Sequence, residues 1–328
     1  STIEDNQAVD GGGVRIYRPR VTISDATIRN NIATQVGGGL MARISDGFID
    51  MTILRTTISG NQAGTSGGGV YIASPEQTFE MQFVNSTISG NSVTSGAGGG
   101  FYLRESNDSL RIALINSTVT NNTAEQGAGV HVFHQDSSFV EMTGTLRLTN
   151  SLIAENLGSD CGGETAGGVP FSGQRVTSFG HNLDSDGTCL PEGVRQASDR
   201  PNGNASLGPL ADNGGATFTH ALLAGSQATD AGDDAVCVST PVAEIDQRGV
   251  TRPQGAHCDI GAYEAAAQPV ATNLLFVSSR SSASAGGVPF RDEDILAYAF
   301  NTQQWQMIFD GSDVGITKDV DAFTFLAD

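Results

Sequence analysis

The feature that most constrains the fold is a five-residue motif that recurs about every thirty residues through the first half of the chain. The motif begins with threonine and an aliphatic residue and ends with asparagine. Clear copies occupy residues 27–31, 57–61, 87–91 and 118–122, with looser copies at 2–6 and 152–156. The final asparagines of the clear copies are 30, 30 and 31 residues apart. A fixed period of this length indicates a repeat architecture in which each cycle is one structural unit.

Every cycle also carries a glycine cluster and two more short alternating segments. The glycine clusters lie at 11–13, 37–39, 67–69, 98–100 and 127–129. Each cluster precedes a strand-like segment such as Val70-Tyr71-Ile72, and another such as Met81-Gln82-Phe83 leads into the next cycle. Strands of three to five residues bury a face only by stacking on their neighbours. The pattern predicts an all-β fold, a parallel β-helix with about 30 residues and three strands per coil.

The recurring glycines and asparagines have structural roles in such a coil. Glycine suits tight corners with positive φ or close approach of neighbouring coils. The asparagine at each bend is expected to hydrogen-bond its equivalent in the next coil. We therefore predict a structural ladder of Asn31, Asn61, Asn91 and Asn122. A leucine-rich repeat would have a shorter period, and a propeller would need four strands per cycle.

These motifs resemble the pectin-lyase-like superfamily of right-handed, single-stranded parallel β-helices. They are more closely similar to bacterial secreted proteins of the "choice-of-anchor Q" type, which are related to polymorphic outer-membrane-protein repeats. The resemblance covers residues 1–265 and includes a terminal segment, Asp246-Gln247-Arg248-Gly249, Arg252-Pro253 and residues 258–264. It implies that the helix finishes near Glu264.

The chain divides into three parts by repeat pattern and composition. Residues 1–264 form the predicted β-helix, with regular coils at 1–157 and irregular coils at 158–264, where 178–187 and 207–220 each suggest one more coil. A linker at 265–272 precedes a small β-rich module at 273–328, with strands expected at 274–277, 295–298, 305–309 and 322–325. Because Ser1 begins inside a repeat and Asp328 ends just after a strand, we expect a processed or partial chain.

The four cysteines all fall in the irregular part, at positions 161, 189, 237 and 258. They have no CxxC or histidine-partner spacing, which favours disulfides over zinc. Their order suggests Cys161–Cys189 and Cys237–Cys258, although four cysteines allow three connectivities. If they are paired, the protein is extracellular or at the cell surface.

The charge balance limits the partners. Seventeen basic against 36 acidic residues give a net charge of −19. That charge repels phosphate backbones and anionic lipids, so we expect no nucleic-acid binding. No apolar run approaches the roughly 20 residues that span a bilayer, so we expect no membrane span in this chain.

Catalysis by a β-helix of this kind needs clustered carboxylates on adjacent coils, because acid–base cleavage of a glycan takes two of them. The middle strand offers Arg15, Met41, Tyr71, Tyr102 and His131 at outward positions, and the following strand offers Thr22, Thr52, Gln82, Ala113 and Arg147. Neither column holds an acidic pair. We interpret the aromatic column as stacking that stiffens the sheet, with sugar binding as the alternative. Charge pairing that fixes the end of the helix is the favoured interpretation of Asp246, Arg248, Arg252, Asp259 and Glu264.

Calcium is the ligand that the acidic loops favour most. Asp184-x-Asp186-Gly187 is a short oxygen-rich loop, while His181, His220 and His257 share no ligand spacing. Hard cations take six to eight oxygen ligands, which loops between strands supply. A simple solvated acidic surface is the alternative. The candidate calcium ligands in the last module are Asp292, Asp294, Asp310, Asp313, Asp319 and Asp321.

Taken together, the sequence predicts a secreted or cell-surface structural protein, such as a stalk, an adhesin or a component of an extracellular matrix or filament, and favours no catalytic activity. The alternative is a β-helix that binds or cleaves polysaccharide as a lyase or glycoside hydrolase. Two partners are expected: a glycan or other cell-surface ligand, and further copies of the chain. Copies would join through an open β-helix end or by strand exchange, because an open strand edge templates pairing.

Overall fold

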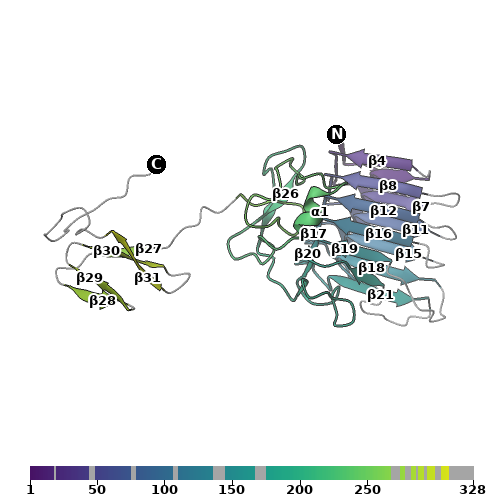
Figure 1. Cartoon of the computed structure of the whole chain (residues 1–328). Coiled ribbons are helices and arrows are strands. Elements are labelled where there is room, and N and C mark those ends of the chain that lie inside the picture. Colours follow the sequence, from purple (N-terminus) through teal and green to yellow (C-terminus); the bar gives the residue numbers. More distant parts are fainter. Residues whose placement is uncertain are drawn as a thin grey trace. The chain divides into compact units, whose positions relative to one another are not determined.

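The computed structural model describes residues 1–17, 20–43, 49–74, 79–105, 110–135, 145–166, 175–266, 274–277, 282–285, 287–291, 294–299 and 304–309. The chain folds as two compact units, Ser1–Ala266 and Ala267–Asp328. The first unit is a parallel β-solenoid, so the predicted all-β helical fold is confirmed. Figure 1 shows its strands stacked side by side from β4 to β21.

Four parallel sheets run along the solenoid. Sheet A consists of β1 (Thr2–Glu4), β5 (Thr27–Arg29), β9 (Thr57–Ser59), β13 (Thr87–Ser89), β17 (Thr118–Thr120), β20 (Leu152–Ala154), β23 (Leu183–Asp184) and β24 (Arg200–Pro201). Sheet B consists of β2 (Gln7–Ala8), β6 (Ile32–Ala33), β10 (Gln62–Ala63) and β14 (Ser92–Val93). Sheet C consists of β3 (Val14–Ile16), β7 (Leu40–Arg43), β11 (Val70–Ser74), β15 (Phe101–Glu105), β18 (Val130–His134) and β21 (Cys161–Thr165). Sheet D consists of β4 (Arg20–Ser24), β8 (Ile49–Leu54), β12 (Phe79–Val84), β16 (Leu110–Ile115), β19 (Leu146–Thr149) and β22 (Val176–Ser178).

The core lies inside the coils and is built from in-register columns. In sheet A, Ile28, Ile58 and Ile88 pair in successive strands and are completely buried. Because side chains alternate along a strand, the residues on either side of each isoleucine point outward. The threonine that opens each motif and the residue two places later therefore form two outward columns on sheet A.

Sheet B adds a fourth, two-residue strand to each of the first coils, beyond the three that the sequence predicts. It forms between the asparagine bend and the glycine cluster. At Gly38, a Cβ would lie 2.4 Å from the carbonyl oxygens of Gln62 and Gly68 in the next coil. Only glycine permits this approach, which lets the chain turn from sheet B into sheet C.

The asparagines form a continuous hydrogen-bonded ladder inside the bend. The side-chain amide of each residue donates to the side-chain oxygen of the next, from Asn31 to Asn61 at 3.0 Å, from Asn61 to Asn91 at 2.9 Å and from Asn91 to Asn122 at 2.9 Å. Asn6 and Asn156 extend the ladder at its two ends. The looser copies of the motif therefore bend in the same way as the clear ones.

The last part of the first unit departs from the expected coils. Residues 178–187 do join the stack through β22 and β23. Residues 207–220, expected to form another coil, instead belong to an antiparallel hairpin of β25 (Leu207–Ala211) and β26 (Thr219–Leu222). The reason is local: this stretch lacks the repeat motif, and Gly214 and Gly215 both take positive φ in the hairpin loop.

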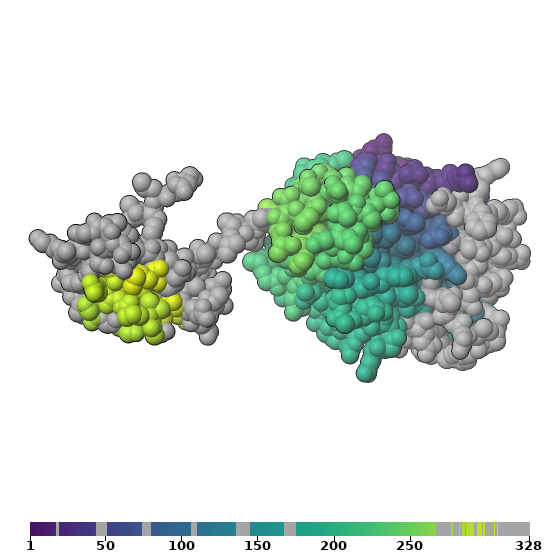
Figure 2. Space-filling view, viewed as in Figure 1, coloured from purple at the N-terminus to yellow at the C-terminus, as the bar shows by residue number. Residues whose placement is uncertain are grey.

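After the hairpin, the chain passes through a short helix, α1 (Asp234–Val238), and runs back over sheet A instead of winding on. We call residues 207–264 the strap. Figure 2 shows the strap, in light green, lying against the purple and blue coils of the first unit. Parallel pairing ends at β24, so the expected irregular coils of 158–264 are coils only up to that strand.

Two disulfides hold the irregular part, and they join the cysteines in the order that the sequence suggested. Cys161 in β21 bonds Cys189, and Cys237 in α1 bonds Cys258. Beyond Cys189, Leu190 and Val194 pack against the core of the solenoid. The segment 189–194 therefore covers the interior at the end of the stack.

The second unit contains a three-stranded antiparallel sheet and a hairpin. The sheet has the order β27 (Leu274–Val277), β30 (Ile295–Ala299) and β31 (Gln304–Phe309). The hairpin joins β28 (Ala283–Ala285) and β29 (Val288–Phe290). The strand expected at 322–325 lies outside the described residues. In the part of the chain that is described, no helix has the length and apolarity needed to cross a membrane.

Candidate functional site

The outer face of sheet A is a regular array of polar side chains. Its first outward column contains Thr2, Thr27, Thr57, Thr87 and Thr118. Its second contains Glu4, Arg29, Ser59, Ser89 and Thr120. Because neighbouring strands lie about 4.8 Å apart, each column repeats one polar group per coil at that spacing.

The strap covers part of this array and satisfies its hydroxyl groups. The hydroxyl of Thr57 donates to the carbonyl oxygen of Phe218 at 2.6 Å, and that of Thr87 donates to the side-chain oxygen of Gln247 at 2.6 Å. The hydroxyl of Thr118 accepts the backbone N–H of Ala262 at 3.0 Å. The strap therefore makes a hydrogen bond to the threonine column in each of three successive coils.

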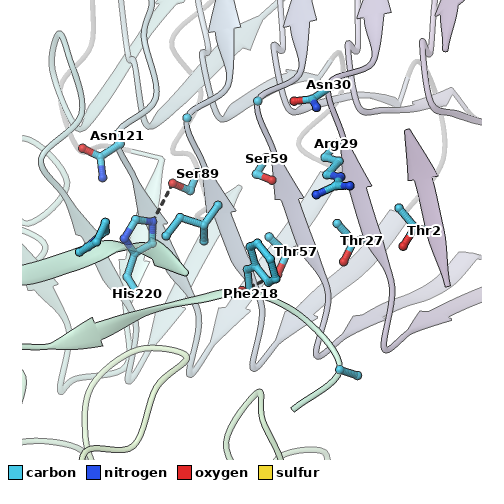
Figure 3. Close-up of a pocket in the computed structure, with 15 residues that line it drawn as sticks. Thr2, Thr27, Arg29, Asn30, Thr57, Ser59, Ser89, Asn121, Phe218 and His220 are labelled. Atoms are coloured by element: carbon cyan, nitrogen blue, oxygen red, sulfur yellow. Dashed lines mark hydrogen bonds between the residues drawn. The ribbon is translucent and has the colours of Figure 1, made fainter. Parts of the chain in front are cut away.

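A cleft of about 860 Å³ remains between the outer face of sheet A and the hairpin of the strap. Figure 3 shows its two sides: Thr2, Thr27, Arg29, Asn30, Ser59 and Asn121 come from the coils, and Phe218 and His220 from the strap. Pro209 and Leu210 of β25 add apolar surface on the strap side. The cleft thus offers hydroxyl and amide groups on one side and apolar groups on the other.

The charge in the cleft is low. Arg29 is the cation among its lining residues, and its guanidinium group donates to the carboxylate of Glu4 at 2.6 Å. Both side chains are about 41% exposed. Among the described residues that line the cleft, none is acidic. The described lining therefore does not present the pair of carboxylates that most glycoside hydrolases use.

Ser89 of sheet A and His220 of the strap contact each other through their side chains. The serine oxygen lies 2.8 Å from Nε2 of His220, and Nδ1 of the same ring lies 2.7 Å from the carbonyl oxygen of Gly208. Both side chains are buried. Burial lowers the pKa of His220 despite the opposing effect of the Gly208 carbonyl, so the ring is neutral at neutral pH.

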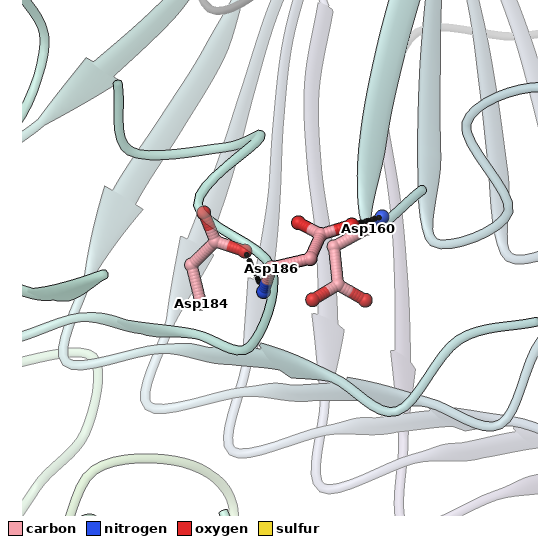
Figure 4. A group of neighbouring side chains, drawn as sticks. All are labelled: Asp160, Asp184 and Asp186. Carbon is pink, nitrogen blue, oxygen red and sulfur yellow. Dashed lines mark hydrogen bonds between the residues drawn. The ribbon is translucent and has the colours of Figure 1, made fainter. Parts of the chain in front are cut away.

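A second cluster of chemical interest lies in the last coils of the stack. Carboxylate oxygens of Asp160, Asp184 and Asp186 lie within 4.8 Å of one another (Figure 4). Burial and the two neighbouring carboxylates raise the pKa of Asp184 to about 8, and burial also raises the pKa of Asp160. Sequence reasoning identified the Asp184–Asp186 loop, but not Asp160, which comes from the preceding coil.

The oxygens of this cluster are already engaged in hydrogen bonds. Asp184 accepts the backbone N–H groups of Cys189 and Leu190 at 2.8 and 2.9 Å. Asp160 accepts the amide of Asn156 and the hydroxyl of Ser185. The cluster therefore ends the asparagine ladder and fixes the segment that covers the core. Calcium binding here stays a prediction.

Of the predicted calcium ligands in the second unit, the structure describes Asp294 alone. Its carboxylate is buried and accepts the backbone N–H of Arg291 at 2.8 Å, which closes a local turn. Asp292, Asp310, Asp313, Asp319 and Asp321 lie outside the described residues.

The charged residues near the end of the strap form a closed network. Arg252 is buried and donates to the carboxylate of Glu264 at 3.2 Å and to the carbonyl oxygens of Asp259 and Gly261. Arg248 donates to Asp246 at 2.8 Å. Each of the two buried charges of the Arg252–Glu264 pair faces an opposite charge, the arrangement that burial of ions requires. This network fastens the strap and leaves no acid–base pair open to a ligand.

The comparisons with known proteins agree with the first half of the architecture. The model of a family described as right handed beta helix region matches residues 1–166. No curated protein and no solved structure matches the chain. The family match ends just beyond β21, the last strand of sheet C, and so covers the regular coils but not the strap.

Proposed function

Since the chain belongs to the right-handed β-helix family, we propose that it acts as an extracellular structural protein of the stalk or adhesin kind. In this proposal the solenoid is a stiff shaft, and the cleft beside the strap holds a glycan chain without cutting its glycosidic bonds. A relationship to the choice-of-anchor Q proteins is part of the same proposal. So is end-to-end joining of copies of the chain.

The observation that carries the proposal is the chemistry of the cleft. Its floor presents hydroxyl and amide groups, including those of Thr27, Ser59 and Asn30, at the regular spacing of the coils. A sugar ring of an extended glycan has a length similar to this spacing, so successive rings meet equivalent groups. The ring of Phe218, 42% exposed on the opposite side, supplies a flat face for a sugar ring.

The absence of carboxylates among the described lining residues favours holding over cutting. Glycoside hydrolysis uses a pair of carboxyl groups on either side of the bond. The described residues that line this cleft instead present hydroxyl groups and an arginine that is paired with Glu4. The two disulfides support an extracellular location, because such bonds persist in oxidising compartments.

Affinity electrophoresis in gels that contain neutral or acidic polysaccharides tests the proposal. We expect the protein to be retarded by at least one neutral polysaccharide, with no reducing ends or unsaturated products released. The Phe218→Ala variant removes the ring but keeps the backbone carbonyl that Thr57 uses, so retardation should fall about tenfold.

Phe179→Ala is the matched control, because this phenylalanine is 60% exposed and is not among the residues that line the cleft. Its retardation should equal that of the unchanged protein. Equal loss in both variants, or release of sugar fragments by the unchanged protein, would contradict a holding function of this cleft.

A further inference from the structure

We propose that Ser89 and His220 form a nucleophile–base pair that hydrolyses an ester whose acyl group enters the cleft. This activity goes beyond the holding function and does not depend on it. It rests on the geometry of the two side chains, on the groups that surround them and on their position at the cleft (Figure 3).

The hydrogen bonds determine which nitrogen of His220 is the base. A carbonyl oxygen only accepts hydrogen bonds, so Nδ1, 2.7 Å from the oxygen of Gly208, carries the proton. Nε2 is then unprotonated and accepts the hydroxyl hydrogen of Ser89 over 2.8 Å. This is the arrangement of an activated serine: a hydroxyl bonded to a base that a third group orients.

The surroundings keep the base in its active form. His220 is 4% exposed and Ser89 is 2% exposed, yet both belong to the wall of the cleft. Burial disfavours the charged imidazolium and so leaves Nε2 free to take a proton at neutral pH. The described lining holds no carboxylate that would reverse this effect.

Hydrogen-bond donors for a developing oxyanion lie beside the pair. Thr120 is the neighbour of Ser89 in sheet A, and its buried hydroxyl has no hydrogen-bond partner among the described residues. The side-chain amide of Asn121, the next residue, lies beside the pair and lines the cleft (Figure 3). Positioned donors of this kind stabilise the charge of a tetrahedral intermediate.

The apolar side of the cleft indicates the substrate class. Pro209 and Leu210 face the polar floor, so an acyl chain fits against them while the alcohol part meets the hydroxyl and amide groups. The ligand class is therefore an acyl ester of a polyhydroxylated alcohol.

The reaction balances without a cofactor. The oxygen of Ser89 attacks the ester carbonyl carbon while Nε2 of His220 takes the hydroxyl proton. The bond from that carbon to the alcohol oxygen then breaks, and the alcohol leaves with the same proton. Water, activated by Nε2, hydrolyses the acyl-serine and releases the carboxylic acid.

A fluorophosphonate probe, followed by peptide mass spectrometry, tests whether Ser89 is a nucleophile. We expect the probe to label Ser89 in the unchanged protein. Ser95→Ala is the control, because Ser95 is an exposed serine of the same repeat and is not among the described residues that line the cleft. This variant should keep the labelling, and Ser89→Ala should abolish it.

Turnover of p-nitrophenyl acetate tests the base. His220→Gln keeps a side chain able to hydrogen-bond Ser89 but lacks a basic nitrogen. It should lose at least about a hundredfold in rate, the size of a general-base contribution. The rate of the unchanged protein should fall as the pH drops and His220 becomes protonated. Circular dichroism and thermal unfolding establish that each variant is folded.

A folded, unchanged protein that neither binds the probe nor turns over the ester would overturn the proposal. The Ser89–His220 bond would then be only a clasp between sheet A and the strap. Glycan retardation is a separate readout, since Ser89→Ala leaves Phe218 and the first coils intact. Loss of probe labelling and loss of glycan binding are thus distinguishable failures.

Discussion

His131 is a buried histidine at the end of an aromatic column on sheet C. Its ring stacks on Tyr102 with centroids 5.2 Å apart, and Tyr102 stacks on Tyr71 at 5.5 Å. The next position in the column is Gly162, so the stack ends there. Among the described residues, neither ring nitrogen of His131 has a hydrogen-bond partner. Burial therefore lowers its pKa to about 4.

This lowered pKa predicts a loss of stability in mild acid. The unfolded chain takes up a proton near pH 6.5 and the folded chain only near pH 4, so the free energy of unfolding falls as the pH drops through this window. His131→Phe keeps the stack and removes the titration. Urea unfolding at pH 5 and pH 8 measures the difference in free energy of unfolding between this variant and the unchanged protein. That difference should favour the variant by about 2 kcal/mol more at pH 5 than at pH 8.

His257 provides a control of opposite sign. It is exposed, and its hydrogen bond to Asp234 at 2.8 Å raises its pKa. Its contribution is present below the unfolded pKa and is lost as the pH rises. His257→Ala should therefore lower stability in acid, and a gain in acid from both substitutions would contradict the assignment to burial.

Asp184 has the opposite pH dependence from His131. Its pKa of about 8 lies above the unfolded value of 3.8, so its contribution is complete below about pH 4 and is lost as the pH rises through 8. Asp184→Asn cannot ionise, and its amide can still accept one backbone N–H group. The gain in stability of this variant over the unchanged protein should be larger at pH 8.5 than at pH 5, by thermal unfolding at both values.

Asp212→Asn is the control for this change, because Asp212 is exposed and also accepts a backbone N–H group. It should change stability equally at both pH values. The same measurement with added calcium tests the predicted cation. If calcium stabilises the unchanged protein at pH 8.5 and Asp184→Asn abolishes this effect, the carboxylates are metal ligands. Burial alone would then not explain the role of Asp184.

At the scale of elements, one buried side chain of the strap makes several of the hydrogen bonds that hold it to sheet A. The amide nitrogen of Gln247 donates to the hydroxyl oxygens of Thr57 and Thr217, each at 2.8 Å, and to the carbonyl oxygen of Phe218 at 3.1 Å. Its side-chain oxygen accepts from Thr87. Gln247 thus links two coils to the hairpin of the strap, because it serves both as donor and as acceptor.

Removal of this amide should loosen the strap without unwinding the coils. Gln247→Ala leaves the buried hydroxyl of Thr87 without its acceptor, at a cost of about 2 kcal/mol. Hydrogen exchange should increase at 217–222 and 247–262 and stay unchanged in sheets C and D. Gln254→Ala is the control, since that side chain is exposed and bonds only the carbonyl of Thr251 among the described residues. Uniform exchange through all sheets would refute a separable strap.

The coils were predictable and the strap was not, for a physical reason. In the motif that ends at Asn31, Asn61 and Asn91, the asparagine forms the bend and the isoleucine points into the core. Because the motif recurs with a fixed period, it also sets the register between the strands of successive coils. The alternating residues of 207–220 suit a coil strand as well as a hairpin strand. The hairpin also contacts the threonine column of sheet A through the carbonyl oxygen of Phe218, and this column is complete only after the coils have formed.

The same argument applies to the candidate site. Ser89 belongs to the repeated motif, and its sequence context indicates only a structural role. His220 lies 131 positions later, in an irregular segment. Only the path of the strap brings the two together, so no local pattern identifies the pair. Asp184 and Asp186 formed a recognisable loop, but Asp160 joins them through stacking of successive coils.

At the scale of the molecule, the solenoid is a one-dimensional stack in which each coil contacts its neighbours. Its free energy therefore depends on what covers the end and on what braces the side. Cys189 and Leu190 cover the end at β21 and are tied to it by the bond to Cys161. The bond between Cys237 and Cys258 braces the side instead, where Asn150 donates to the carbonyl oxygen of Asp233.

Removal of each disulfide should therefore destabilise a different part of the first unit. Each closes a loop of similar length, with separations of 28 and 21 residues, and each should cost about 3 kcal/mol when replaced by paired alanines. Without Cys161–Cys189, hydrogen exchange should be fastest in β21 and β22 and decline coil by coil toward β8, because a stack frays from an uncovered end. Without Cys237–Cys258, exchange should rise in the strap and along β13, β17 and β20 together, because the brace spans them. The same exchange profile in both variants would mean that end and side unfold as one unit, and the separation of shaft and strap would be wrong.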